Sequence, residues 1–135
     1  MLIPPVSILR SDPPPDETVV VVRGGERSLD DAVLDRTVGD CWDAHGFFGL
    51  SVFADPASAD LAELARRTPL VRRRVVRTAL VGRLREAGFE VMPTFANRYH
   101  FSIVMPDATA RTFEQVRLCF GPPMPNPGYD PDGGR

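Results

Sequence analysis

The sequence predicts a single domain that combines helices and strands, an α/β (α+β) fold with a two-layer sandwich built on a mixed four-stranded sheet. The chain has 135 residues, the usual size of one domain. Hydrophobic residues make up 43% of it and charged residues 25%, as in ordinary globular proteins. Segments typical of strands and of amphipathic helices follow one another in the order β-α-β-α-α-β-β-α.

Prolines divide the chain into three parts, because they gather at its two ends. Five lie in residues 1–15 and five in residues 122–135. We therefore expect an extended leader over residues 1–15, one globular domain over residues 16–121 and a disordered proline- and glycine-rich tail over residues 122–135. The leader has no basic segment or cleavage site, and no apolar run is long enough to span a bilayer. We expect a cytoplasmic protein without a secretory signal.

The first part of the domain is predicted to hold two strands and three helices. Residues 18–23 are a β-branched run typical of a buried strand, and residues 47–54 form the second strand. Between them, a serine cap and two aspartates begin a helix over residues 28–44. A short helix over residues 58–67 precedes a longer one over residues 69–88, which starts at a proline and ends at a glycine.

The second part is predicted to be a hairpin followed by a helix. Apolar and polar residues alternate over residues 89–95 and 99–105. A three-residue loop would pair Thr94 with Arg98 and keep the polar side chains on one face. A helix over residues 107–119 follows. Because the other connections run through helices, we expect parallel pairing elsewhere, with helices mainly on one face of the sheet.

The net charge of −2 hides a strong asymmetry. Residues 66–85 contain eight arginines and no acidic residue, so they carry +8, whereas eight arginines and eighteen acidic residues elsewhere carry −10. The chain has no lysine, which is typical of GC-rich genomes. The basic segment suits a polyanionic or acidic partner, nucleic acid or protein, in a regulatory or toxin–antitoxin role. The alternative is that aspartates elsewhere neutralise it. The candidate binding residues are Arg72, Arg73, Arg74, Arg77, Arg85 and Arg98.

Residues 61–91 resemble a winged helix-turn-helix. The stretch LAELARRTPLVRRRVVRTALVGRLREAGFEV is similar to a first helix, a basic recognition helix and an exit into a β-wing. The chain departs from that pattern because Pro69 occupies the turn and two strands precede the segment. The resemblance implies a wing at Arg98 and a recognition helix that enters the major groove through Arg72, Arg73, Arg74 and Arg77.

The predicted polar face of the hairpin is a candidate catalytic site. It gathers a carboxylate, an imidazole, a guanidinium and two hydroxyls, which suits acid–base chemistry at a phosphate or glycosyl centre. An exposed sheet face is polar in any case, which is the simpler interpretation. The residues of this face are Glu90, Thr94, Arg98, His100 and Ser102.

A third candidate lies after the first strand, where Arg23 and two glycines precede a helix N-terminus that would attract anions. In order along the chain, Arg23, Ser51 and Glu90 resemble the arginine, serine and glutamate of mono-ADP-ribosyltransferases. This resemblance implies an enzyme that acts on NAD. Together with the hairpin face, it makes a small toxin-like enzyme acting on RNA or NAD the alternative function, with Glu90, His100 and Arg23 as its catalytic candidates. A purely structural protein–protein interaction module is the remaining alternative.

The cysteines and histidines do not predict a metal site. Cys41 and His45 stand one helical turn apart, and a zinc site with His100 and Cys119 is conceivable. No CxxC or HxxxH pair supports it, so we expect buried thiols, no disulfide, no metal and no cofactor.

Four motifs resemble those of a set of short proteins from GC-rich bacterial genomes. They are a VRGG start, a GLSVFA strand, an AGFEV segment followed by TF, and an FGPP segment followed by PNP. The resemblance covers most of the predicted domain and implies no function.

Overall fold

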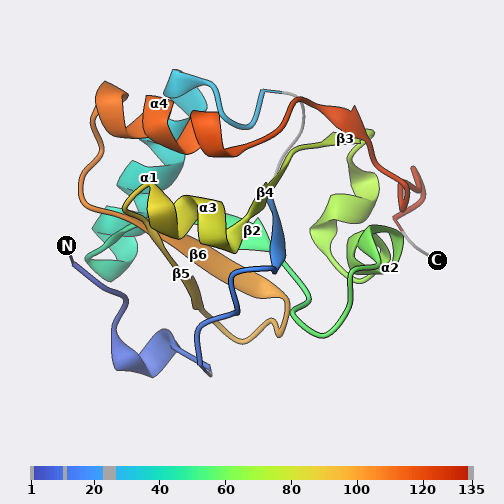
Figure 1. The fold of residues 1–135 in the computed structure, drawn as a ribbon, viewed down its shortest axis with the longest axis horizontal. Coiled ribbons are helices and arrows are strands. Elements are labelled where there is room, and N and C mark those ends of the chain that lie inside the picture. The colour runs from blue at the N-terminus through green and yellow to red at the C-terminus, as the bar shows by residue number, and fades with distance from the viewer. Residues whose placement is uncertain (1, 11, 23–26, 134–135) are drawn as a thin grey trace.

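The computed structural model describes residues 2–10, 12–22 and 27–133 (Figure 1). Within them, no helix is long and apolar enough to cross a bilayer. The helices are η1 (Val6–Ile8), α1 (Asp31–His45), α2 (Leu61–Arg66), η2 (Pro69–Arg72), α3 (Val81–Glu86) and α4 (Ala110–Cys119), where η marks a 3-10 helix.

The main sheet has five strands in the order β4-β1-β2-β6-β5, and every neighbouring pair is antiparallel. The α+β class is confirmed, but the prediction of a mixed, four-stranded sheet is wrong. β1 and β2 lie side by side and antiparallel, with Val21 opposite Phe53, although α1 lies between them in the chain. The five strands are β1 (Val19–Val22), β2 (Phe48–Phe53), β4 (Thr78–Leu80), β5 (Glu90–Pro93) and β6 (His100–Met105).

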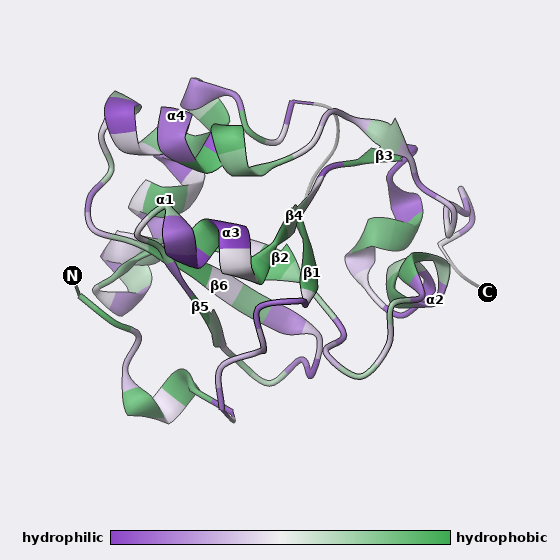
Figure 2. Ribbon diagram, viewed as in Figure 1, coloured by the Kyte–Doolittle hydropathy of each residue, from purple (hydrophilic) through white to green (hydrophobic). Residues whose placement is uncertain are grey.

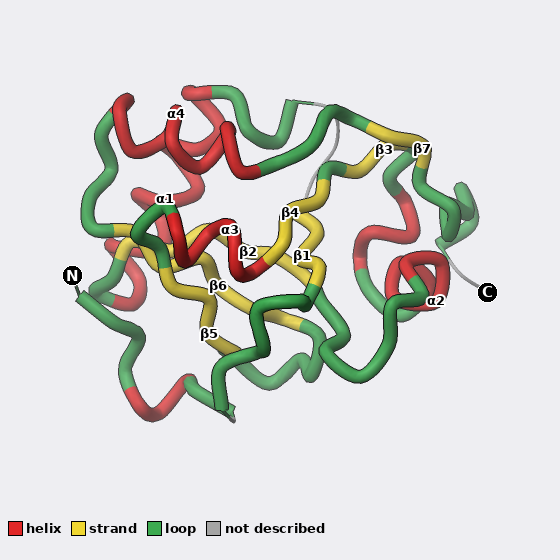
Figure 3. Tube along the Cα trace, in the orientation of Figure 1, coloured by secondary structure: helices red, strands yellow, loops and turns green. Residues whose placement is uncertain are grey.

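The long helix predicted over residues 69–88 is absent. The chain forms η2, then a loop, the two-residue strand β3 (Val75–Val76) and β4 before α3 begins (Figure 3). Valine and threonine recur through this stretch, and their branched side chains favour strands over helices. β4 pairs with β1, so Val20 lies opposite Ala79. β4, which the sequence did not predict, is thus an edge strand of the main sheet.

The hairpin of β5 and β6 is confirmed, although its loop is longer than predicted. Thr94 lies opposite His100 and not Arg98, because the Thr94 N–H donates to the His100 carbonyl (3.2 Å). The partner of Thr94 is therefore two residues from the predicted one. A shift of two residues keeps each side chain on the face of the hairpin that was predicted for it. The leader runs beside this hairpin, since Leu9 bridges Thr94 and the Arg10 guanidinium donates to the His100 carbonyl.

Two hydrophobic clusters hold the elements together. The larger one joins one face of the sheet, including Val52 and Ile103, to side chains from α1, α3 and α4. Hydrophobic and hydrophilic residues alternate along α4, as its half-buried position requires (Figure 2). The smaller cluster joins Val21 and Phe53 on the other face to α2, η2 and β3. Helices therefore pack against both faces, where the sequence predicted mainly one.

The predicted disordered tail contains a strand and specific contacts. β7 (Met124–Pro125) pairs with β3, and the chain beyond it lies against α2 and η2 at one side of the molecule (Figure 1). Gly128 is buried where a Cβ atom would come within 2.5 Å of the Ala62 carbonyl oxygen. Only glycine fits so close an approach, so the tail is extended but closely packed.

Candidate functional site

The candidate arginines do not share one helix. Arg72 ends η2, Arg73 and Arg74 lie in the loop that follows, Arg77 lies between β3 and β4, and Arg85 belongs to α3. The winged-helix resemblance placed the first four on a recognition helix, but no α-helix forms there. The arginines are concentrated in the sequence, but the single helix that was predicted to carry them does not form.

Carboxylates neutralise part of the basic segment. Arg85 contacts Asp16 (2.6 Å) and Glu90 (2.8 Å), while Glu63 contacts both Arg66 (3.5 Å) and Arg67 (2.6 Å). Among the described residues, five arginines of the segment have no carboxylate oxygen within 4.0 Å. They are Arg72, Arg73, Arg74, Arg77 and Arg83.

Three of these five are exposed and consecutive, and we call Arg72, Arg73 and Arg74 the arginine loop. Arg77 and Arg83 instead donate to the carbonyls of Gly121 and Leu118, each at 3.0 Å. The arginine loop thus presents three guanidinium groups to solvent on adjacent residues.

The tail fixes the backbone of the arginine loop. The side-chain amide of buried Asn126 donates to the carbonyls of Leu70 and Arg73, both at 2.8 Å. The Asn126 N–H also donates to the Arg74 carbonyl (2.9 Å). The Arg74 guanidinium lies over the Tyr129 ring, 5.5 Å from its centroid. The loop is therefore held in one conformation by side-chain and backbone contacts from the tail.

The hairpin face carries a buried polar cluster rather than an open polar surface. His100 is 8% exposed, Ser102 2% and Thr94 0%. Thr94 Oγ1 lies 2.9 Å from His100 Nδ1 and 2.8 Å from Ser102 Oγ. On the other ring nitrogen, His100 Nε2 lies 3.0 Å from Ser51 Oγ of β2. The structure thus forms a hydrogen-bonded chain from Ser102 through Thr94 and His100 to Ser51.

The chain of hydroxyls opens onto a cavity of about 260 Å³ at Ser51 and Ser102. One side of α1 forms the opposite wall with Cys41 and His45. Phe95 completes the lining, and its ring centroid lies 4.8 Å from that of His45 and 5.1 Å from that of His100. Phe95 has a φ of 63°, which is rare for a non-glycine residue. A strained residue at a cavity wall is typical of functional sites.

Among the described residues, the other predicted catalytic and wing residues, Glu90 and Arg98, make contacts elsewhere. Glu90 pairs with Arg85 at the far end of β5, and exposed Arg98 lies over the Tyr99 ring, 4.8 Å from its centroid. Arg23 lies outside the described residues, so its place is not described. The sequence singled out His100 but not its bond to Ser51. Ser51 itself was named only through the resemblance to mono-ADP-ribosyltransferases, which does not pair it with His100.

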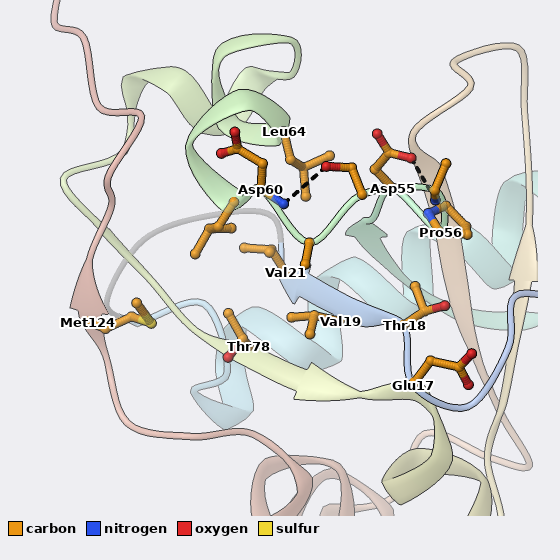
Figure 4. Close-up of a pocket in the computed structure, with 14 residues that line it drawn as sticks. Glu17, Thr18, Val19, Val21, Asp55, Pro56, Asp60, Leu64, Thr78 and Met124 are labelled. Atoms are coloured by element: carbon orange, nitrogen blue, oxygen red, sulfur yellow. Dashed lines mark hydrogen bonds between the residues drawn. The ribbon is translucent and has the colours of Figure 1, made fainter.

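A second cavity of about 450 Å³ lies between the start of β1, the loop after β2 and the first turn of α2 (Figure 4). Figure 4 shows apolar side chains around its interior and carboxylates at its rim. Such a lining suits a ligand that joins an apolar body to a positive charge. The apolar residues include Val19, Val21, Leu64 and Met124, and the acidic ones are Glu17, Asp55 and Asp60.

Neither cysteine forms a disulfide, and burial raises the pKa of the thiols of Cys41 and Cys119. Within the described part of the chain, no three histidine, cysteine, aspartate or glutamate side chains are placed to hold a metal ion. No protein-family model, curated protein or solved structure is found to match this chain.

Proposed function

We propose that this protein binds a polyanion, the phosphate backbone of a nucleic acid, through the arginine loop. The observation that carries the proposal is the exposure of Arg72, Arg73 and Arg74 without a carboxylate within 4.0 Å among the described residues. Guanidinium groups pair with phosphate oxygens in a bidentate geometry, so three adjacent arginines suit a phosphate backbone.

The clamp by Asn126 supports the same proposal. A flexible loop would lose conformational entropy on binding, which weakens affinity. Here the backbone at Leu70, Arg73 and Arg74 is already held by hydrogen bonds of 2.8–2.9 Å. The Arg74 guanidinium also lies over the Tyr129 ring before any partner binds. The fold therefore reduces the conformational entropy that the arginine loop loses when it binds a partner.

Reversing two charges of the arginine loop tests the proposal. We expect Arg72→Glu with Arg73→Glu to weaken binding to a DNA duplex and to a single-stranded RNA by at least about tenfold at low salt. Arg74 is left unchanged because its contact with Tyr129 belongs to the clamp. Fluorescence anisotropy with labelled oligonucleotides measures the change.

The matched control is Arg36→Glu with Arg111→Glu, two exposed arginines on α1 and α4. It alters the net charge by the same amount, so it should leave most of the affinity intact if the arginine loop is the site. Equal losses in both double variants would overturn the proposal. No binding of the native protein to either nucleic acid would also overturn it, and would favour an acidic protein as the partner.

A further inference from the structure

We propose that Ser51 is a nucleophile that accepts short acyl groups from esters, with His100 as its general base. Ser51 lines the cavity of about 260 Å³, and its Oγ lies 3.0 Å from Nε2 of the buried His100. A nucleophile in hydrogen-bond contact with a base that a third group orients is the usual arrangement for covalent catalysis. This site is separate from the arginine loop, and the proposal does not depend on nucleic-acid binding.

The hydrogen bonds indicate which ring nitrogen of His100 carries the proton. His100 Nδ1 lies 3.2 Å from the Thr94 carbonyl oxygen as well as 2.9 Å from Thr94 Oγ1. A carbonyl oxygen can only accept, so the proton is assigned to Nδ1. Nε2 is then the acceptor, and the Ser51 hydroxyl donates to it. This is the proton arrangement that activates a serine for attack.

The hydroxyls of the cluster differ in their access to the cavity. Ser51 and Ser102 both line the cavity, but Ser102 and Thr94 are buried, whereas Ser51 keeps part of its surface. Ser51 also sits in β2, the central strand of the main sheet, and lies directly opposite Ser102 of β6. Pairing on both sides of β2 holds its backbone in place. Ser51 is therefore both accessible and rigidly positioned.

The cavity limits the substrate to a small acyl group. Its volume of about 260 Å³ is below the usual range for sites of drug-sized ligands. Gly49 preserves this space, because a Cβ atom there would approach Cys41 Sγ to 3.0 Å and the Phe47 ring to 2.5 Å. Cys41 is a weak competitor for the acyl group, since burial raises its pKa and keeps the thiol protonated.

The proposed reaction has two steps, acylation of Ser51 and hydrolysis of the acyl group. Ser51 Oγ forms a bond to the ester carbonyl carbon while its proton passes to His100 Nε2. The bond from that carbon to the leaving alcohol breaks, and Nε2 returns the proton to the alcohol oxygen. A water molecule then attacks the acyl carbon and gives its proton to Nε2. Ser51 regains a proton as the carboxylic acid leaves.

The experiment treats the protein with p-nitrophenyl acetate, follows nitrophenolate release and locates the acetyl group by peptide mass mapping. Because the chain has no lysine, background acetylation is limited to few groups. All variants are made in a background protein that carries Cys41→Ala and Cys119→Ala, so neither thiol can take the acetyl group. We expect acetyl on Ser51, no such product in Ser51→Ala and release at least about 100-fold slower in His100→Gln. Ser58→Ala, at an exposed serine elsewhere, should match the background protein.

Two variants of Thr94 test whether its hydroxyl positions His100 for the reaction or only stabilises the fold. Thr94→Ser keeps the hydroxyl that contacts His100 and should keep the rate, whereas Thr94→Val should lower it about tenfold. Should His100→Gln fail to fold, labelling of the native protein with a sulfonyl fluoride tests Ser51 directly. Acetyl or sulfonyl groups found only away from Ser51, or equal release by Ser51→Ala, would overturn the proposal.

Discussion

Replacing Phe53 with alanine is expected to lower the free energy of unfolding by about 3–5 kcal/mol. Phe53 is 2% exposed and links the main sheet to the smaller cluster, which holds Leu64 of α2 and Leu70 of η2. Its ring also meets the edge of His100, with centroids 5.6 Å apart. The alanine would leave a cavity between the sheet and the α2–η2 unit. Urea denaturation followed by circular dichroism measures the loss.

Phe53→Leu is the control for this effect. It keeps most of the buried volume, so its cost should be about 1.5 kcal/mol or less. If Phe53→Ala cost no more than Phe53→Leu, the smaller cluster would not connect the two parts of the molecule as described.

Asn126→Ala is expected to lower the free energy of unfolding by about 2–4 kcal/mol, because it leaves two carbonyls without their donor. The lost bonds are those to Leu70 and Arg73, both 2.8 Å long. The Asn126 side chain also accepts from the Gly128 N–H (3.0 Å). The tail should then detach locally, so the amide of Asp130, which donates to the Val71 carbonyl, should exchange its hydrogen faster.

Asn97→Ala is the matched control for this variant. Asn97 is exposed and its side chain makes one comparable bond, accepting from the Tyr99 N–H (2.9 Å). We expect it to cost about 1 kcal/mol. An Asp130 amide that exchanges at the native rate in Asn126→Ala would show that the tail does not depend on this clamp.

The sequence predicted those elements whose pattern is local. The glycine after α1 and the alternation in β5 and β6 correctly indicated a helix end and a hairpin. Strand direction was missed because it depends on partners distant in the chain. Residues 69–80 were assigned to a helix from the spacing of apolar residues, although their branched side chains favoured the extended pairing that β1 provides.

The candidate sites were predictable to a similar extent. Charge counting found the arginine loop, and alternation placed His100 with Thr94 on one face. The contact with Ser51 depends on the register between β2 and β6, which no local pattern fixes. The role of Asn126 was hidden because a proline-rich composition indicates disorder on average, while one buried amide with three hydrogen bonds orders the segment.

The salt dependence of nucleic-acid affinity tests the central claim, that the arginine loop makes the phosphate contacts. The logarithm of the binding constant is measured against the logarithm of salt concentration for the native protein and for Arg72→Gln with Arg73→Gln, which leaves the contact of Arg74 with Tyr129 intact. Two lost contacts with duplex DNA predict a slope that is shallower by about 1.8. Identical slopes for the two proteins would contradict the claim, because the loop would then displace no counterions.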